Sequence, residues 1–549
     1  MKTKIFLFVI GVLFLASCSE DFITRDLDKG SYIPSTFYDT EAKANQGINA
    51  IYAGLRNNNF FNWHFVFGDD FAETGYAAGF MPWPATLNFD IRNSDGNVAN
   101  IWNMAYANIL RANLALQEIP NARDKDPEIS PDDYNLMMGQ AYFLRAFNYY
   151  YLYWYYPQDK IVLRTVPPTT LADYSFPPST SDEVFKFIES DLKNAQELLV
   201  KGLSTTRNYE KFRATRGAAA AYLGKLYMMK KMYTEAAAEF KKILPGVGDA
   251  AYGTYALADD YRRNFTIAGE NTNSSVNTES IFEIYYEDLS ENMTSNFLQN
   301  MTMSRNTQPD QWWNFAIPKF KLDEFETWTE EIDGKTTTVY DYRAYQTFWG
   351  VPNGANFTAS PRNGGFKDWV QQLWHTESAG SSGIAGALGM RKYAVDSDAE
   401  FPSRGTITSE VNIRLVRLAD IMLLYAECLA NINPGATGAD GAAYWVDMVR
   451  ERANKPMGDQ SHLYSARPDV KGQLPPVSEL MAAKGWNLMQ VIEHERYVEG
   501  YAEGWNKEDL KRWEKGADYV KYKSNWQGYQ SLTLPVPLSE EQNNPNMPK

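Results

Sequence analysis

Long stretches of the sequence carry apolar residues at steps of three and four, and this spacing constrains the fold more than any other feature. Between Val98 and Ile119 the pattern is typical of a helix that is buried along one face. A second helix is predicted from about Asp132 to Tyr155, because Ser130 is a suitable cap and Pro131 follows it. A third is predicted to open near Ser181. We therefore expect a mostly α-helical fold of stacked hairpins.

The sharpest repeat signal lies at residues 223–245. They match the tetratricopeptide pattern of L-G-x-x-Y, then A-x-x-x-F, then a proline. The small residues Gly224 and Ala236 would let two antiparallel helices approach closely, with Tyr227 and Phe240 filling the groove between them. An unrelated helical hairpin with the same packing needs is the alternative.

The composition changes between two kinds of segment along the chain. Further helices are predicted at about Asn412–Asn431, Gly438–Arg452, Trp486–Tyr501 and Lys507–Gly516. Residues 250–408 are instead rich in Gly, Asn, Ser, Thr and aromatics, and the alternating pieces Ile281–Tyr286 and Thr336–Tyr340 favour short strands. We expect scaffold helices at about 40–59, 98–245 and 409–516, and loop-rich mixed inserts at about 60–97 and 250–408.

The first residues have the pattern of an export signal. Lys2 and Lys4 precede an apolar run that is well short of the roughly 20 residues needed to span a bilayer. The run ends in Leu-Ala-Ser-Cys at residues 15–18, which is similar to a bacterial lipobox. We expect residues 1–17 to be a lipoprotein signal peptide and the domain 18–549 to be lipid-anchored through Cys18. A stray cysteine in an ordinary signal peptide is the alternative.

Charge and cysteine content exclude some functions. The 549 residues include 53 Lys and Arg against 68 Asp and Glu, a net charge of −15, so the chain lacks the basic field that nucleic acid binding requires. Of the two cysteines, Cys428 alone remains after lipidation, so no intramolecular disulfide is expected. The 35 Tyr and 15 Trp exceed what helix cores need, and some of them could bind a flat ligand.

Ten blocks in a fixed order run along the chain: Ile101–Asn113, Gly139–Ala146, Arg213–Ala219, Ile413–Asp420, Leu424–Glu427, Glu493–Arg496, Glu503–Asn506, Asp509–Trp513, Leu534–Pro537 and Asn544–Asn546. With the lipobox, their order and spacing resemble the SusD-like (RagB/SusD) family of Bacteroidetes outer-membrane lipoproteins. Asn506 departs from the family pattern, in which many relatives have arginine before the Asp-Leu pair, and this weakens inferences about local salt bridges. No block matches the middle segment, where such proteins differ in ligand.

The resemblance implies a non-catalytic glycan-binding lipoprotein that sits as a lid on a SusC-like TonB-dependent barrel and passes oligosaccharides inward. It also implies a scaffold of four tetratricopeptide-like hairpins that faces the barrel, with the inserted loops as the ligand surface. The implied partners are an oligosaccharide or polysaccharide, the barrel and the outer membrane, without a cofactor. Ser19-Glu20-Asp21 is similar to the acidic signal that directs such lipoproteins to the cell surface, although a solvated polar tail explains these residues equally well.

A sugar-binding site needs flat aromatic platforms with polar groups beside them. The strongest candidate is Trp83, which two prolines hold in an extended loop and which polar residues such as Arg92 and Asn93 follow. The pair Trp312 and Trp313 is the next candidate. Weaker ones are Trp349, Trp369 and Trp63. For each of these tryptophans, a role in loop packing is the alternative.

Residues on the predicted helices are expected to be structural. Six tryptophans are assigned to the core: Trp102, Trp154, Trp445, Trp486, Trp505 and Trp513. Five charged residues are assigned to ion pairs within the scaffold: Arg145, Arg417, Glu427, Arg496 and Asp509.

Catalytic and metal signals are poor. The four histidines are scattered without a ligand spacing such as H-E-x-x-H, so no metal site is predicted. Residues 246–251 mimic part of a dinucleotide fingerprint, but they follow a predicted helix instead of a strand. Carboxylate pairs could serve a glycosidase only at a separation that the sequence does not reveal. We therefore favour a binding protein over two alternatives, a surface glycoside hydrolase and a peptide-capturing lid of the same type of transporter.

Overall fold

The structure is a computed structural model of the 549-residue chain. It describes residues 37–56, 76–77, 91–170, 173, 175–199, 213–266, 269, 277–286, 315–332, 334–349, 351, 387–393, 411–454, 473–515 and 533–548. In these parts the fold is mostly helical, as predicted, with three small antiparallel sheets.

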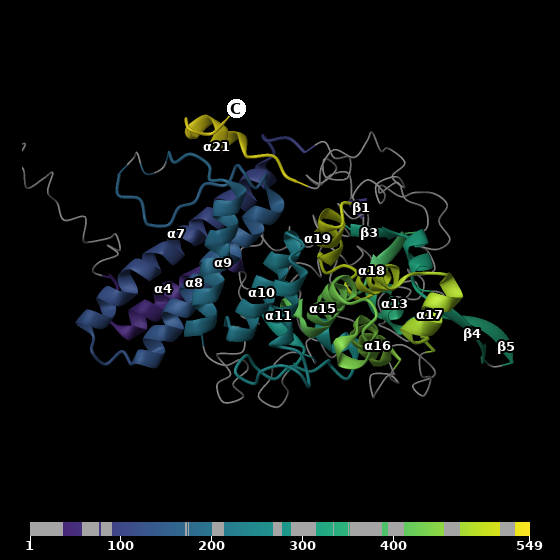
Figure 1. Ribbon diagram of the computed structural model, residues 1–549. Coiled ribbons are helices and arrows are strands. Elements are labelled where there is room, and N and C mark those ends of the chain that lie inside the picture. Colours follow the sequence, from purple (N-terminus) through teal and green to yellow (C-terminus); the bar gives the residue numbers. More distant parts are fainter. Residues whose placement is uncertain are drawn as a thin grey trace, which may run out of the picture.

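The helices form one continuous array in which each packs on its neighbour in the chain (Figure 1). The N-terminal part consists of α4 (Glu41–Leu55), α7 (Gly96–Lys125), α8 (Pro131–Tyr155), α9 (Ser181–Leu198), α10 (Arg216–Met229) and α11 (Tyr233–Lys241). From α11 the array continues into α15 (Leu418–Ile432), α16 (Ala442–Ala453), α17 (Val477–Lys484), α18 (Leu488–Glu499) and α19 (Trp505–Arg512). No helix in the described ranges is long and apolar enough to cross a membrane.

Local capping explains where two of the long helices begin. The Ser130 hydroxyl accepts a hydrogen bond from the backbone N–H of Asp133, and Pro131 occupies the first turn of α8. Thr180 and Glu183 form a reciprocal capping box at the start of α9. The helices predicted at Asp132 and near Ser181 are therefore confirmed.

The core of the N-terminal part is aromatic. The second half of α8 is buried on every side, and its Phe143 and Phe147 rings meet Tyr222 of α10 edge to face. Phe282 of β2 (Ser280–Ile284) inserts between them, with ring centroids 4.9 Å from Phe143 and 5.4 Å from Phe147. The small sheet of β2 and β8 (Ile413–Arg417) is thereby fixed against the helices.

One predicted boundary is wrong. The helix expected from about Asn412 begins only at Leu418, because residues 413–417 form β8 and pair antiparallel with β2. All five residues of this strand are buried, and cross-strand pairing outweighs the local helical spacing. The opposite deviation occurs in α7, which runs past the predicted end at Ile119 and through Pro120 to Lys125, because Ile119 and Ala122 continue its buried face.

The remaining elements lie in the predicted inserts, between α15 and α16, and near the C-terminus. Two predicted strands are confirmed, at β2 and at β5 (Lys335–Tyr340), which forms a hairpin with β4 (Thr327–Ile332). The others are η4 (Tyr261–Phe265), η6 (Lys319–Glu324), α13 (Tyr342–Thr347), η7 (Gly438–Asp440), α21 (Leu538–Asn543), β1 (Tyr76–Ala77), β3 (Phe315–Pro318), β6 (Phe348–Trp349) and β7 (Ala387–Met390). Figure 1 shows the β4–β5 hairpin projecting from one end of the molecule.

Helices α10 and α11 form a hairpin where the tetratricopeptide pattern was found. The Phe240 ring of α11 lies directly against Gly224 of α10, so that a Cβ at position 224 would clash with the ring. The Tyr227 hydroxyl instead donates a hydrogen bond to Glu189 of α9 at 2.6 Å. The predicted close approach at Gly224 is therefore present, while the membership of this hairpin in a tetratricopeptide series stays a prediction.

We predict that Gly224→Leu lowers the free energy of unfolding by about 2–3 kcal/mol, because the added side chain overpacks the contact with Phe240. The matched control is Gly96→Leu in the first turn of α7, where a Cβ would meet nothing within 4 Å. Denaturant unfolding followed by circular dichroism measures both variants. Equal losses in the two variants would contradict this account of the hairpin.

Candidate ligand-binding site

A four-stranded sheet joins the two loop-rich regions of the chain. Its strand order is β1-β3-β7-β6, with every neighbouring pair antiparallel. Strand β1 comes from the first predicted insert, and the other three strands come from the second. Tyr76 pairs with Ala316, and Ala316 in turn pairs with Gly389. The backbone therefore brings two distant stretches of sequence, each rich in aromatic residues, into one sheet.

The sheet places some of the predicted site residues and leaves others undetermined. Trp349 lies in β6, with its Cα opposite that of Gly389. Trp312 and Trp313 immediately precede β3 in the sequence, and Trp83 follows β1 by a short segment. The side chain of Trp349 lies outside the described part of the structure, as do the whole residues Trp83, Trp312, Trp313, Trp369, Trp63 and Cys18.

Arg92 and Asn93 are described, and both lie just before α7. The Asn93 amide donates a hydrogen bond to Glu541 of α21 at 2.9 Å, and its carbonyl accepts one from the N–H of Leu538. Farther along the same C-terminal segment, the Asn544 amide donates to the carbonyl of Phe176. Asn93 therefore ties the end of the first insert to the C-terminus, a contact that sequence reasoning did not foresee.

Beneath the sheet, the helical scaffold contains a buried cluster of charges centred on Arg417. This fully buried guanidinium uses all five of its N–H bonds. Two donate to the Glu503 carboxylate at 2.8 Å, one to Glu279 at 2.8 Å and one to the Glu499 carboxylate at 2.6 Å. The fifth donates to the Glu499 carbonyl at 2.9 Å. Strand β8, the segment before β2 and the end of α18 therefore meet at one side chain.

A second guanidinium extends this cluster toward the sheet. Arg343 of α13, the short helix that leads directly into β6, pairs with Asp341 at 2.7 Å and with Glu499 at 3.0 Å. It also donates a hydrogen bond to Glu495 of α18. All four side chains are completely buried. The segment that carries Trp349 is thus fixed to the scaffold by paired charges.

Arg450 of α16 completes the cluster at the base of the β4–β5 hairpin. It binds Glu326 at 2.9 Å and Glu495 at 2.8 Å. Burial alone would raise the pKa of Glu326, but the nearby His494 and the hydrogen bonds and charge of Arg450 outweigh it and lower the pKa to about 2. The pKa of Glu499 is also lowered, because the charges of Arg452, Arg417 and Arg343 outweigh the effect of its burial. These carboxylates are therefore ionised at neutral pH.

A separate group of charges joins the N-terminal and C-terminal helices. Lys225 of α10 lies 3.0 Å from both Asp420 of α15 and Glu508 of α19. Arg496 of α18 pairs with Asp420 at 3.0 Å and with Asp509 at 2.7 Å, and Arg512 binds both Asp509 and Glu427. Because these partners come from four helices, the group fixes how the two halves of the array pack.

The predicted structural residues have the expected roles. All five predicted ion-pair residues are paired, including Arg145, which binds Asp191 through two hydrogen bonds of 2.7 and 2.8 Å. Four of the six helix tryptophans are buried, at Trp102, Trp154, Trp445 and Trp505, while Trp486 and Trp513 are partly buried. Glu499, Arg343 and Arg452 were not identified from the sequence as members of the buried ion-pair cluster. The spacing of Glu495 and Glu499 by one helical turn, which places both carboxylates on one face of α18, could have indicated it.

Metal and nucleotide chemistry find no support among the described residues. No cluster of three or more His, Cys, Asp or Glu side chains that could hold a metal ion occurs in them. His494 lies against the ring of Trp486 and 3.7 Å from Glu326, and the other three histidines lie outside the described ranges. The glycine-containing segment at 246–251 follows α11, a helix, as the sequence indicated.

We predict that Arg417→Met lowers the free energy of unfolding by at least about 3–5 kcal/mol, because three buried carboxylates lose their shared partner. Lys193→Met is the control, since it removes an exposed ion pair with Glu189 and should cost less than about 0.5 kcal/mol. Chemical denaturation at pH 7 compares the two variants. A loss at Arg417 as small as that at Lys193 would refute the central role of this guanidinium.

Comparison with known proteins shows similarity along nearly the whole chain. A family model described as "Starch-binding associating with outer membrane" matches residues 25–228, and a model of the SusD family matches residues 278–548. SusD-like protein P2 of Formosa agariphila is 22% identical over 571 aligned positions, which cover 100% of this chain and 99% of that protein.

Solved structures share the fold at low sequence identity. A SusD superfamily protein from Bacteroides vulgatus is 21% identical and superimposes with a TM-score of 0.69, covering 93% of this chain and 98% of that one. Surface glycan-binding protein A from Bacteroides thetaiotaomicron, solved in complex with laminarihexaose, is 17% identical with a TM-score of 0.67. The match covers 93% of this chain and 99% of that one.

Proposed function

The chain belongs to the SusD/RagB family, and from this premise we propose that it is a glycan-binding lipoprotein of the outer-membrane surface. It captures oligosaccharides and delivers them to a SusC-like TonB-dependent transporter. The observation that carries this proposal is the β1-β3-β7-β6 sheet, which joins the segments next to Trp83, Trp313 and Trp349. Glycan-binding relatives with the same fold support it.

In this proposal the sheet is the rigid base of the binding surface. Tryptophan rings stack on the apolar C–H faces of sugar rings, and nearby amides, carboxylates and guanidinium groups bind the hydroxyls. A base that is fixed before the ligand arrives reduces the entropy lost on binding. Trp83, Trp312, Trp313 and Trp349 are the proposed platforms, with Trp369 and Trp63 beside them and Arg92 and Asn93 as polar partners.

Three buried carboxylates of the cluster around Arg417 are suited to a structural role and not to acid catalysis. A glycosidase needs a carboxylic acid that keeps its proton near neutral pH. Burial alone would raise the pKa of the buried acids Glu279, Glu326 and Glu499, but neighbouring hydrogen bonds and positive charges outweigh it and lower all three. Each of these acids is bound by arginine side chains of the scaffold. They are therefore suited to hold the fold together rather than to protonate a leaving group.

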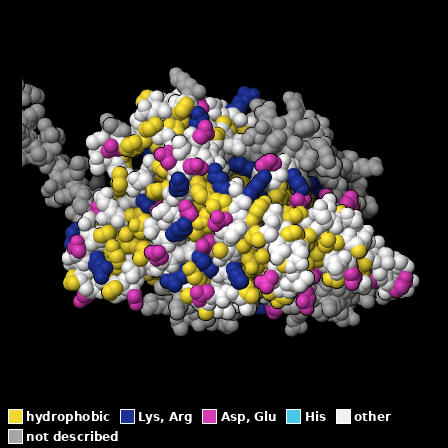
Figure 2. Space-filling model, viewed as in Figure 1, with side chains coloured by type: hydrophobic (Ala, Val, Ile, Leu, Met, Phe, Trp, Pro, Cys, Tyr) yellow, Lys and Arg dark blue, Asp and Glu magenta, His cyan; other side chains and the backbone are white. Residues whose placement is uncertain are grey.

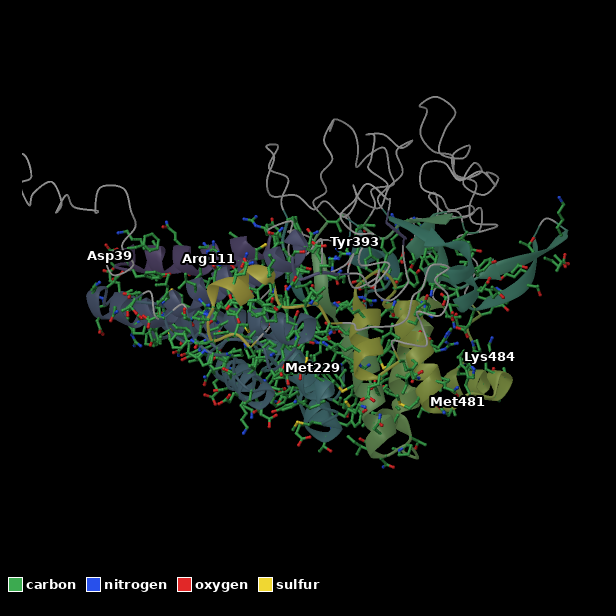
Figure 3. All side chains as sticks on the ribbon, turned by 90° about the horizontal axis from the view of Figure 1, so that it is seen from above. Asp39, Arg111, Met229, Tyr393, Met481 and Lys484 are labelled. Carbon is green, nitrogen blue, oxygen red and sulfur yellow. The ribbon has the colours of Figure 1, made fainter. Side chains whose placement is uncertain are left out.

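The helical face of the molecule suits contact with a transporter. Figure 2 shows hydrophobic side chains interspersed with Lys and Arg on the face formed by the helices. Ile432 at the end of α15 and Tyr444 of α16 are large hydrophobic residues with exposed fractions of 47% and 43%. In Figure 3, Met229 of α10 and Met481 of α17 lie toward one side of the molecule, away from Tyr393, a buried residue that follows β7.

We predict that the purified protein is retarded in native gels that contain a soluble polysaccharide from a panel including laminarin, starch and xylan, and that it releases no reducing ends. Trp83→Ala and Trp312→Ala should each weaken binding by about 10-fold or more, because aromatic anchors dominate binding energy. Trp486→Ala is the control, since this partly buried tryptophan packs against His494 in the scaffold.

Each outcome of this experiment has a defined meaning. Loss of retardation in the Trp83 or Trp312 variant, while the Trp486 control is still retarded, supports the proposed platforms. Unchanged binding in both the Trp83 and the Trp312 variants refutes them. Release of reducing ends that disappears on changing one carboxylate would replace the proposal with a glycoside hydrolase. Failure to bind any polysaccharide, together with a peptide recovered in complex with the transporter, would replace it with peptide capture.

We predict that Cys18→Ser moves the protein from the membrane fraction to the soluble fraction, because the acyl chains supply the membrane affinity. Fractionation of cells that express the full chain, followed by mass spectrometry of the mature N-terminus, measures this change. Ser19→Ala is the control and should remain lipidated. A Cys18→Ser protein that is still membrane-bound after a high-salt wash would show that another part of the chain provides the attachment.

A further inference from the structure

Lys392 lies where the four-stranded sheet meets the helical scaffold. It closely follows β7, the strand that pairs with both β3 and β6, and it is completely buried. Its ammonium donates hydrogen bonds to the carbonyl of Tyr501 at 2.5 Å, to Oε1 of Glu503 at 2.8 Å and to the carbonyl of Glu499 at 3.3 Å. Glu499 is the last residue of α18, and Tyr501 and Glu503 lie in the turn that follows it. At the C-terminal end of a helix, carbonyl groups and the helix dipole favour a cation.

Aromatic rings enclose the rest of the ammonium group. The centroids of the Phe265 and Tyr261 rings lie 4.6 and 5.0 Å from Nζ, at distances typical of cation–π contacts. Burial lowers the pKa of Lys392 to about 8, against the opposing effect of the Glu503 carboxylate. The side chain therefore remains charged at neutral pH and holds its acceptors as an ammonium.

The residues on either side of Lys392 are also fixed. The backbone N–H of Arg391 donates to the carbonyl of Thr347 at 2.7 Å, next to the β6–β7 pairing. Tyr393 is buried, has a φ of 61° and meets the Phe265 ring edge to face at 5.4 Å. The chain therefore leaves β7 through a left-handed turn whose direction is set by packing on both sides of Lys392.

We propose that Lys392 is a positioning residue for ligand binding, because its ammonium sets where the whole β1-β3-β7-β6 sheet lies over the end of α18. Strand β7 transmits this position directly to β3 and β6, and β3 transmits it to β1. The backbones that lead to Trp313, Trp349 and Trp83 thus share the attachment at Lys392, in addition to the one that Arg343 provides before β6. The inference rests on the proposed function only where it concerns the ligand, since the attachment itself can be measured without one.

The test compares Lys392→Met with Lys225→Met by hydrogen–deuterium exchange of the full-length protein. Both lysines are buried and paired with carboxylates, but Lys225 binds Asp420 and Glu508 between helices, away from the sheet. We expect Lys392→Met to raise amide exchange in β6, β7 and Arg391 by at least 10-fold and to leave α15 protected. Lys225→Met should lower the thermal midpoint without changing exchange in these strands.

Ligand binding supplies the readout that a merely structural role would not change. In gels containing the polysaccharide that retards the wild-type protein most, Lys392→Met should bind at least 5-fold more weakly, while Lys225→Met should bind normally. If Lys392→Met does not fold, Lys392→Gln replaces it, because its amide still donates a hydrogen bond and should give a smaller change in the same direction.

The two readouts separate the possible failures. Unchanged exchange in β6 and β7 overturns the attachment, whatever the binding result. Faster exchange with undiminished binding overturns the positioning role. If the wild-type protein binds no polysaccharide in the panel, the proposed function fails, and exchange alone decides whether Lys392 holds the sheet in place.

Discussion

The five hydrogen bonds of the Arg417 guanidinium are the interaction on which the rest of the structure depends. Its partners are Glu279 before β2, Glu499 at the end of α18 and Glu503 in the turn that follows. A buried charge is tolerated only when it is paired and hydrogen-bonded, so none of these groups can be moved singly without leaving another unsatisfied. Each buried charge in this cluster needs its partners, and each partner needs it in return. Few other arrangements of the chain segments that supply these charges would satisfy all of them.

This constraint explains how a scaffold of helices can hold an irregular insert in a defined place. The free energy gained by apolar packing is roughly proportional to the buried area, so two apolar surfaces can slide past each other at little cost. A guanidinium that binds two carboxylates instead has one favourable geometry. Arg343 holds the segment before β6 in this way. Lys392 holds the segment after β7 through its ammonium group, which is less directional than a guanidinium. Because β6 and β7 are antiparallel, both attachments lie at the same end of this pair, and they join the sheet to α18 and the turn that follows it.

The predictable parts of the fold were those determined locally. The buried faces of α7 and α8, the cap at Ser130 and the glycine contact in the α10–α11 hairpin all follow from residues a few positions apart. The sequence predicts a helix at β8 because its five apolar and basic residues fit both the helical and the strand periodicity. The partner strand β2, which decides between them, is distant in sequence. The pairing of Tyr76 with Ala316 could not be predicted for the same reason. Arg417 and Arg496 were recognised as scaffold ion pairs, but their partners required the fold.

The proposed ligand platforms were predictable only as a composition of tryptophan beside polar groups, and they stay a prediction. Two kinds of residue have different roles in this protein. A paired buried charge such as Arg417 resists substitution, because its loss leaves several carboxylates without a partner. If the loop tryptophans are ligand platforms as proposed, their replacement is expected to lower ligand affinity more than stability, since binding residues are concentrated on loops. A scaffold of this kind can therefore acquire a new ligand by changing loops, while the charges that position those loops remain in place.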